Sequence, residues 1–158
     1  MMKTLDFSQL NLQNIFDKWD KVHEEFKQYP KQSLGHRSYL CEKIIESESN
    51  SKLNYLVDHS LGDFIDNNGL YYESKEVKDA FKRHTTPEIV VKNFRGRCLG
   101  KPSKTYDYLI VWDRDRRMVA MFDHEYIDQK MMVKDAVITV KLEITKAIRV
   151  KSLSEILL

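Results

Sequence analysis

Few segments of this sequence could form a flexible linker or a membrane span. Its 158 residues include only 5 glycines and 3 prolines, and they contain no repeat or low-complexity run. No apolar run approaches the roughly 18 residues of a membrane span, and the first residues lack the apolar core of a signal peptide. We therefore expect a single domain that is long enough to bury a core and has no membrane as a partner.

Cysteine is also scarce, and the net charge is small. The two cysteines, Cys41 and Cys98, are typical of a protein in a reducing cytoplasm, and neither has the spacing of a metal-ligand motif. A net charge of +2 means that the overall composition does not require an anionic partner. Any indication of a partner must therefore come from local clusters of charge.

The first third of the sequence has the apolar spacing of helices. Residues 10 to 27 are predicted to form an amphipathic helix whose apolar face includes Trp19. That face either packs on the core of the protein or forms half of a dimer interface. A second helix is predicted over residues 38 to 45, and a further short helix around residues 53 to 57.

Strand patterns dominate the second half of the chain. Apolar runs at residues 106 to 112 and 118 to 122 flank a charged hairpin connection. The first run is apolar enough to be a central strand that is buried on both faces. Residues 137 to 144 alternate between apolar and polar and predict a half-exposed strand. The sequence thus predicts an α+β domain, with helices first and a mixed sheet afterwards.

Two capping boxes predict further helix starts. Thr85 and Glu88, with Pro87 in the first turn, predict a helix that runs to about residue 95. Ser152 and Glu155 predict a short helix at the C-terminal end of the sequence.

A tight β-hairpin is predicted around residues 66 to 69. Their sequence, Asp-Asn-Asn-Gly, is a strong turn signal between two runs rich in aromatic and β-branched residues. A three-residue loop with the glycine in the left-handed conformation places Ile65 opposite Tyr71. Two residues further along each strand, Asp63 is then expected to face Glu73.

Lys75 is expected to lie on the same face of this hairpin as Glu73, because side chains alternate along a strand. With Asp63, two carboxylates and one ammonium then form a site suited to a hard divalent cation. An acid two residues before a lysine occurs four times in the sequence, against about three expected by chance, so that spacing alone is uninformative. Only the pair at Glu73 also has an upstream aspartate delivered by a turn.

Residues 92 to 104 carry five basic side chains and no acid, and two glycines and a proline make the second half of this run a loop. A solvated loop is the simplest interpretation. Beside an acidic metal site, however, contact with phosphate groups is favoured. The five basic residues are Lys92, Arg95, Arg97, Lys101 and Lys104.

The residues from Gly62 to Lys75 also carry a resemblance. Their two acids, the Asp-Asn-x-Gly turn and the Tyr-Glu-x-Lys ending resemble the active-site hairpin of PvuII-like type II restriction endonucleases, which have the PD-(D/E)xK nuclease fold. The likeness continues through Phe81, His84 and Arg95. It implies a Mg²⁺-dependent endonuclease of the prokaryotic cytoplasm that hydrolyses phosphodiesters and makes double-strand cuts in DNA at a short, palindromic site.

The same resemblance assigns roles to four residues of the hairpin. By position, Asp63 and Glu73 would bind Mg²⁺ together with the carbonyl group of Ser74, and Lys75 would position or deprotonate the attacking water. These roles agree with the chemistry of Mg²⁺, which takes one or two carboxylates plus water and a substrate phosphate.

The resemblance further implies how the chain is organised. It predicts one nuclease domain over residues 1–158, with a helical dimerisation region at residues 1–45 and a sheet region for catalysis and DNA recognition at residues 60–145. The homodimer is expected to form through the helix of residues 10 to 27, which resembles the dimerisation helix of that family. A dimer is the simplest solution for a small nuclease, because one active site cuts one strand and a symmetric duplex site needs two.

Two departures from the family bear on DNA recognition and on the active site. The family has consecutive histidines where this sequence has Arg83, His84 and Thr85, so its recognition sequence does not carry over. Arg can donate two hydrogen bonds to guanine, and His or Thr can add one, so we expect these three residues to contact bases. The alternative is that Arg83 contacts only a phosphate or a carboxylate. Phe94 stands where the family has a tyrosine that supports the active site, which removes one polar contact.

Two other functions remain open. A junction resolvase or repair nuclease could use the same fold and the same residues on branched or nicked DNA. Alternatively, in a non-catalytic DNA-binding or scaffold protein, Asp63, Glu73 and Lys75 would form an exposed salt-bridge cluster that adds little stability.

Overall fold

In a computed structural model, the protein is built around a six-stranded mixed sheet. The structure describes residues 3–29, 34–58, 61–77, 88–94, 106–130 and 138–153. In spatial order, the strands of this sheet are β1 (Leu53–Tyr55), β2 (Phe64–Asp66), β3 (Tyr71–Val77), β5 (Tyr108–Asp113), β6 (Met118–Asp123) and β8 (Arg149–Ser152). A separate pair consists of β4 (Glu88–Phe94) and β7 (Ile138–Glu143). The helical elements are α1 (Leu12–Phe26), α2 (Leu34–Ser47), α3 (His124–Lys130) and the 3₁₀ turns η1 (Phe7–Gln9) and η4 (Ile144–Lys146).

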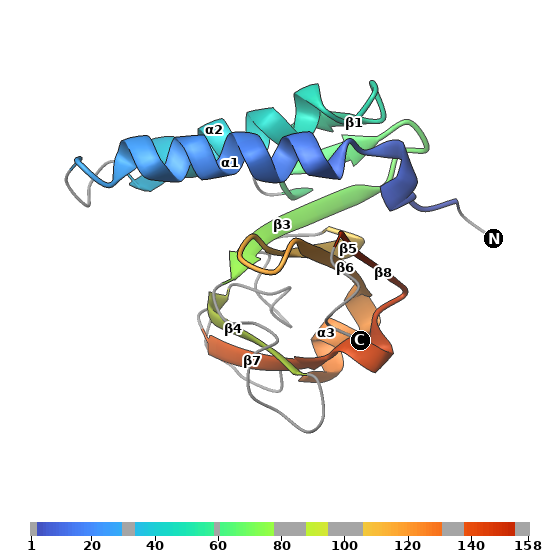
Figure 1. Ribbon diagram of the computed structural model, residues 1–158. Helices are drawn as coiled ribbons and strands as arrows, with labels where there is room; N and C mark the ends of the chain where they lie inside the picture. Colours follow the sequence, from blue (N-terminus) through green and yellow to red (C-terminus); the bar gives the residue numbers. More distant parts are fainter. Residues whose placement is uncertain are drawn as a thin grey trace.

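The large sheet separates two groups of elements. Helices α1 and α2 lie side by side against one face, and β4, β7 and α3 lie on the other side (Figure 1). This arrangement confirms the predicted α+β class and the mixed sheet. Among the described residues, no helix is both long enough and apolar enough to cross a membrane.

Helix α1 begins at a side-chain cap and buries one face. The Asn11 side chain accepts a hydrogen bond from a backbone N–H group of the first turn, which would otherwise lack a helical partner. Phe16 and Trp19 are buried, and their ring centroids lie 6.0 and 5.3 Å from that of Trp112 in the sheet. The helix predicted over residues 10 to 27 is confirmed, and these side chains fill the core of the protein itself.

Strand β5 lies at the centre of the sheet. It pairs parallel with β3 and antiparallel with β6, and its residues from Leu109 to Asp113 are all buried. Ile110 and Trp112 enter the core beneath α1 and α2, whereas Leu109 and Val111 enter the core beside α3 and β7. This alternation confirms the prediction of a central strand that is buried on both faces.

The prediction of a short helix around residues 53 to 57 is wrong. Residues Leu53–Tyr55 form β1, which pairs antiparallel with β2. Leu53 is buried but Val57 is exposed, so the apolar residues of this segment do not share one helical face. The neighbouring strand supplies hydrogen bonds that the local apolar spacing does not reveal.

The prediction of a helix from Thr85 to about residue 95 is also wrong over residues 88 to 94, which are the part that the structure describes. Glu88 begins β4 and pairs with Glu143 of β7. The Ile-Val-Val run that follows Glu88 is β-branched, which favours a strand when a partner strand is present. Thr85 itself lies outside the described residues.

The remaining predicted elements are confirmed where they are described. The helix expected over residues 38 to 45 is part of the longer α2, and the strand expected over residues 137 to 144 is β7. Ser152 is the last residue of β8 and pairs with Met118. The helix predicted after Ser152 lies outside the described residues, and α3 was not predicted.

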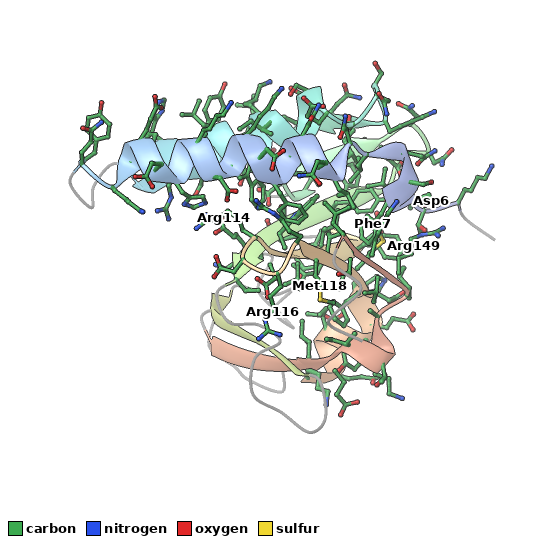
Figure 2. The ribbon with its side chains drawn as sticks, in the orientation of Figure 1. Asp6, Phe7, Arg114, Arg116, Met118 and Arg149 are labelled. Atoms are coloured by element: carbon green, nitrogen blue, oxygen red, sulfur yellow. The ribbon has the colours of Figure 1, made fainter. Side chains whose placement is uncertain are left out.

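Charge pairs fasten the loop between β5 and β6 to α1. Arg114 lies beside α1 in Figure 2, and its Nη1 atom is 3.0 Å from Oδ1 of Asp20. Arg117 donates to the same carboxylate, and this hydrogen bond is the main reason that the pKa of Asp20 is lowered. The Arg117 guanidinium also lies 5.4 Å from the centroid of the Phe16 ring. The helix and the sheet are thus held together by charge as well as by apolar packing.

Candidate active site

The β2–β3 hairpin forms as predicted around its turn. Ile65 pairs with Tyr71, and the N–H group of Asp66 donates to the carbonyl of Leu70 over 2.9 Å. Gly69 has a φ of +81°, the left-handed conformation that the loop requires. The Asp66 side chain also accepts a hydrogen bond from the N–H of Leu70 over 3.0 Å, so the turn is held on both sides.

Asp63 departs from the regular pairing at the other end of the hairpin. Pairing ends at Phe64 opposite Tyr72, and the N–H of Asp63 also donates to the Tyr72 carbonyl over 2.8 Å. Asp63 and Phe64 therefore both oppose Tyr72, as in a β-bulge. The prediction that Asp63 faces Glu73 in the ladder is wrong, because it assumed regular pairing up to Asp63. Its side chain nevertheless reaches β3, because Oδ2 of Asp63 accepts from the N–H of Ser74 over 2.8 Å.

Gly62 allows the chain to enter this bulge. Its φ is +124°, and a Cβ atom at this position would lie 2.8 Å from the carbonyl oxygen of Tyr72. That oxygen accepts the hydrogen bond from the N–H of Asp63. A side chain at position 62 would therefore displace the acceptor that fixes the backbone of Asp63.

Glu73 and Lys75 share the face of the sheet that lies away from α1 and α2. Ser74 points toward the helices, where its hydroxyl group accepts from Nε1 of Trp112 over 2.9 Å. Val77 packs in the core on the opposite side. Because side chains alternate along a strand, Glu73 and Lys75 lie on the Val77 side, which confirms the prediction that they share one face.

The donor set of this site suits a hard divalent cation. Asp63 is 3% exposed and Glu73 is 6% exposed, so both carboxylates are largely removed from water. The N–H and C=O groups of one strand residue point to the same side, so the Ser74 carbonyl faces the same edge as the N–H that binds Asp63. Two carboxylates and a carbonyl are oxygen ligands of the kind that Mg²⁺ prefers. The residues present therefore fit this cation.

Of the residues predicted to contact DNA, Lys92 is the one that lies within the described residues. Lys92 lies in β4, whose backbone alone is described, and β4 lies near the C-terminal end of β3 (Figure 1). The predicted base contacts and the remaining predicted phosphate contacts lie outside the described residues. They are Arg83, His84, Thr85, Arg95, Arg97, Lys101 and Lys104.

Asp113 is a buried acid on the same face of the sheet as Glu73 and Lys75, and it was not predicted from the sequence. It pairs with Val77 at the end of the β3–β5 ladder and is fully buried. Its Oδ1 atom accepts from the N–H of Arg116 over 3.2 Å, and within the described chain its Oδ2 atom has no hydrogen-bond partner. Burial raises the pKa of this carboxyl above its usual range. In the sequence it is indistinguishable from a solvated turn residue.

Comparison with known proteins assigns no family. The sequence matches no protein-family model, and a search of curated proteins also gives no match. The functional interpretation therefore depends on the geometry of the site and on the resemblance of its hairpin.

Replacing Gly62 with Ala should destabilise the protein more than replacing Gly69 with Ala. A Cβ atom at Gly69 would meet nothing within 4 Å, so that change should cost ~1 kcal/mol of backbone strain. Gly62→Ala adds the clash with the Tyr72 carbonyl and should cost ~1–3 kcal/mol more. Urea unfolding of both variants measures the difference, and equal losses would contradict the close approach.

Replacing Asp113 with Asn should stabilise the protein at neutral pH. Because burial raises the folded-state pKa of Asp113, ionising it in the native state costs stability as the pH rises from about 4 through that raised pKa. Asn keeps an acceptor for the N–H of Arg116 and carries no charge. Unfolding free energies of both proteins at pH 4 and pH 7 test this: the advantage of Asn should be larger at pH 7, and a pH-independent difference would contradict it.

Proposed function

We propose that the protein is a Mg²⁺-dependent type II restriction endonuclease that makes double-strand cuts in DNA at a short, palindromic site. The observation that carries this proposal is the 2.8 Å hydrogen bond from the N–H of Ser74 to the Asp63 carboxylate. It joins an acid of the bulge to the strand that carries Glu73 and Lys75. The proposal includes a PD-(D/E)xK nuclease fold and a place in the prokaryotic cytoplasm.

The side chains of the hairpin divide the chemistry between them. Asp63, Glu73 and the Ser74 carbonyl would hold Mg²⁺, which when bound polarises the phosphoryl oxygen and lowers the pKa of the attacking water. As a neutral amine, Lys75 Nζ would accept a hydrogen bond from that water and then its proton; as an ammonium group, it would donate to the phosphate oxygens as their negative charge grows. Because β3 is a central strand paired with β5, these groups are on a rigid support.

Burial of the acids favours such a site over a surface salt-bridge cluster. An exposed cluster of two acids and a lysine would have both carboxylates in water, whereas Asp63 and Glu73 are 3% and 6% exposed. Removing carboxylates from water costs free energy, which hydrogen bonds and positive charge offset, as the N–H of Ser74 does for Asp63. A bound cation would add positive charge beside both acids, and buried acids of this kind are typical of functional sites.

Double-stranded DNA is the proposed substrate. In this proposal the basic residues from Lys92 to Lys104 contact phosphates, which adds affinity without sequence preference. Arg83, together with His84 or Thr85, reads bases in the major groove. Sequence recognition then depends on the segment that follows β3 directly, so recognition and catalysis are linked along the chain.

A homodimer through the helical region completes the proposal. The apolar face of α1 packs in the protein's own core, so the contact is assigned to an exposed group of aromatic side chains beside it. Tyr29 and Tyr39 are 54% and 43% exposed; Tyr29 contacts Phe26 with centroids 5.5 Å apart, and Tyr39 stacks on His36 at 6.3 Å. Aromatic side chains are enriched at protein interfaces, which supports this choice of surface.

Glu73→Gln and Lys75→Met should each reduce cleavage of a large plasmid in Mg²⁺ by more than about a hundredfold, because each removes one charge from the reacting centre. Both changes preserve side-chain size, so the proteins should remain folded by circular dichroism. The matched controls are Glu25→Gln and Lys27→Met. These two exposed residues have the same acid-x-lysine spacing and lie at the end of the N-terminal helix. Gel analysis of the plasmid products, with an EDTA control, measures the rates.

The same assay separates the other functions. Retained cleavage in Glu73→Gln would refute the assignment of the site. Preference for branched or nicked DNA without an internal palindromic site would indicate a junction resolvase or repair nuclease instead. Binding of DNA without metal-dependent cleavage would indicate a non-catalytic protein.

Changing both Tyr29 and Tyr39 to Ser should convert the dimer to a monomer at micromolar concentration. Both side chains are exposed, so the loss of contact area should affect association rather than folding. Light scattering measures the mass of both proteins, and Val57→Ser, at another exposed apolar residue, serves as the control. A monomeric wild-type protein that still makes double-strand breaks in single encounters would contradict the dimer.

A further inference from the structure

Three metal-ligating side chains from different elements meet between the helices and the sheet. They are His23 of α1, Cys41 of α2 and Glu76 of β3, whose ligand atoms all lie within 4.8 Å of one another. His23 Nε2 is 2.7 Å from Oε1 of Glu76. Cys41 is buried, while the side chains of His23 and Glu76 are 10% and 23% exposed. The cluster is thus largely buried but in partial contact with solvent through His23 and Glu76.

Packing of the surrounding elements holds these groups in place. The indole Nε1 of Trp19 donates to the carbonyl of Cys41 over 2.9 Å, which fixes α2 against α1 one turn before His23. Glu76 lies on the helix-facing side of β3, two residues beyond Ser74, whose hydroxyl group accepts from the sheet on that side. Each donor is therefore on a rigid element, as a metal site requires.

Arg114 places a positive charge beside the carboxylate of the cluster. Its Nε atom lies 3.7 Å from Oε2 of Glu76, which is an ion pair too long for a hydrogen bond, while the other oxygen, Oε1, faces His23. The charge of the guanidinium favours the ionised carboxylate, which is the form that binds a metal ion.

We propose that His23, Cys41 and Glu76 bind one Zn²⁺ ion, with water as the fourth ligand. Nitrogen, sulfur and carboxylate oxygen are the donors that Zn²⁺ takes, and three protein ligands plus water is a common arrangement. Mg²⁺ prefers oxygen donors and has little affinity for sulfur, so this site is distinct in chemistry from that of Asp63 and Glu73.

Binding of Zn²⁺ would displace a proton from Cys41 and break the hydrogen bond between His23 and Glu76. Burial, assisted by the charge of Glu76, raises the pKa of the Cys41 thiol to about 12, so the thiol is protonated at neutral pH in the absence of a cation. Zn²⁺ binding releases that proton to solvent and replaces the hydrogen bond between His23 and Glu76 with two metal–ligand bonds. The ion would join α1, α2 and β3 and so stabilise the folded chain.

The first test uses Co²⁺ as a spectroscopic substitute for Zn²⁺ on the metal-free full-length protein. The wild-type protein should develop a thiolate-to-cobalt charge-transfer band that saturates at one equivalent per chain and that added Zn²⁺ removes. Cys41→Ser should lose the band, and Cys98→Ser, at the other cysteine of the sequence, should keep it. Persistence of the band in Cys41→Ser, or its loss only in Cys98→Ser, would overturn the assignment.

The second test measures Zn²⁺ affinity and thermal unfolding, and it stands apart from DNA cleavage. Zn²⁺ should raise the Tm of the wild-type protein, and His23→Gln or Glu76→Gln should weaken Zn²⁺ binding by more than about tenfold. Glu73→Gln should bind Zn²⁺ like the wild type, because Glu73 lies on the opposite face of β3. Absence of one-to-one Zn²⁺ binding by the wild-type protein would refute the proposal without any variant.

Discussion

The hydrogen bond from the backbone of Ser74 to the Asp63 carboxylate is the contact on which the candidate site depends. Asp63 leaves the β-ladder at a bulge, so regular strand pairing alone would not direct its side chain to β3. The bond also depends on the core: Trp112 donates to the hydroxyl group of Ser74 and packs against Trp19 of α1. The packing of α1 is thus connected through two hydrogen bonds to the position of an acidic ligand.

The sequence predicted the features that local chemistry controls. The Asp-Asn-Asn-Gly turn specified the hairpin, because its residues supply both the left-handed conformation and the side-chain hydrogen bond of the turn. The bulge at Asp63 was not predictable in this way, since it depends on contact between Gly62 and the backbone of Tyr72. Pairing between distant strands likewise overrode the capping pattern that ends at Glu88.

Residues that approach one another only in the folded protein were missed. Cys41 has no metal-ligand spacing in the sequence, yet His23 and Glu76 reach it from separate elements. Asp113 resembles a solvated turn residue, but the ladder with β3 buries it opposite Val77. In both cases tertiary packing sets the surroundings of an ionisable group, and no local pattern records that packing.

The parallel pairing of β3 with β5 also sets the order in which the protein can fold. The Asp63–Ser74 bond spans 11 residues, whereas the bond between the N–H of Tyr71 and the Asp107 side chain spans 36. Closing the longer loop costs more chain entropy before any contact compensates it, so the hairpin can form before the sheet that supports it. A nascent chain would then present its acidic hairpin early, and the site would become rigid only after residue 113 has been synthesised and β5 has docked.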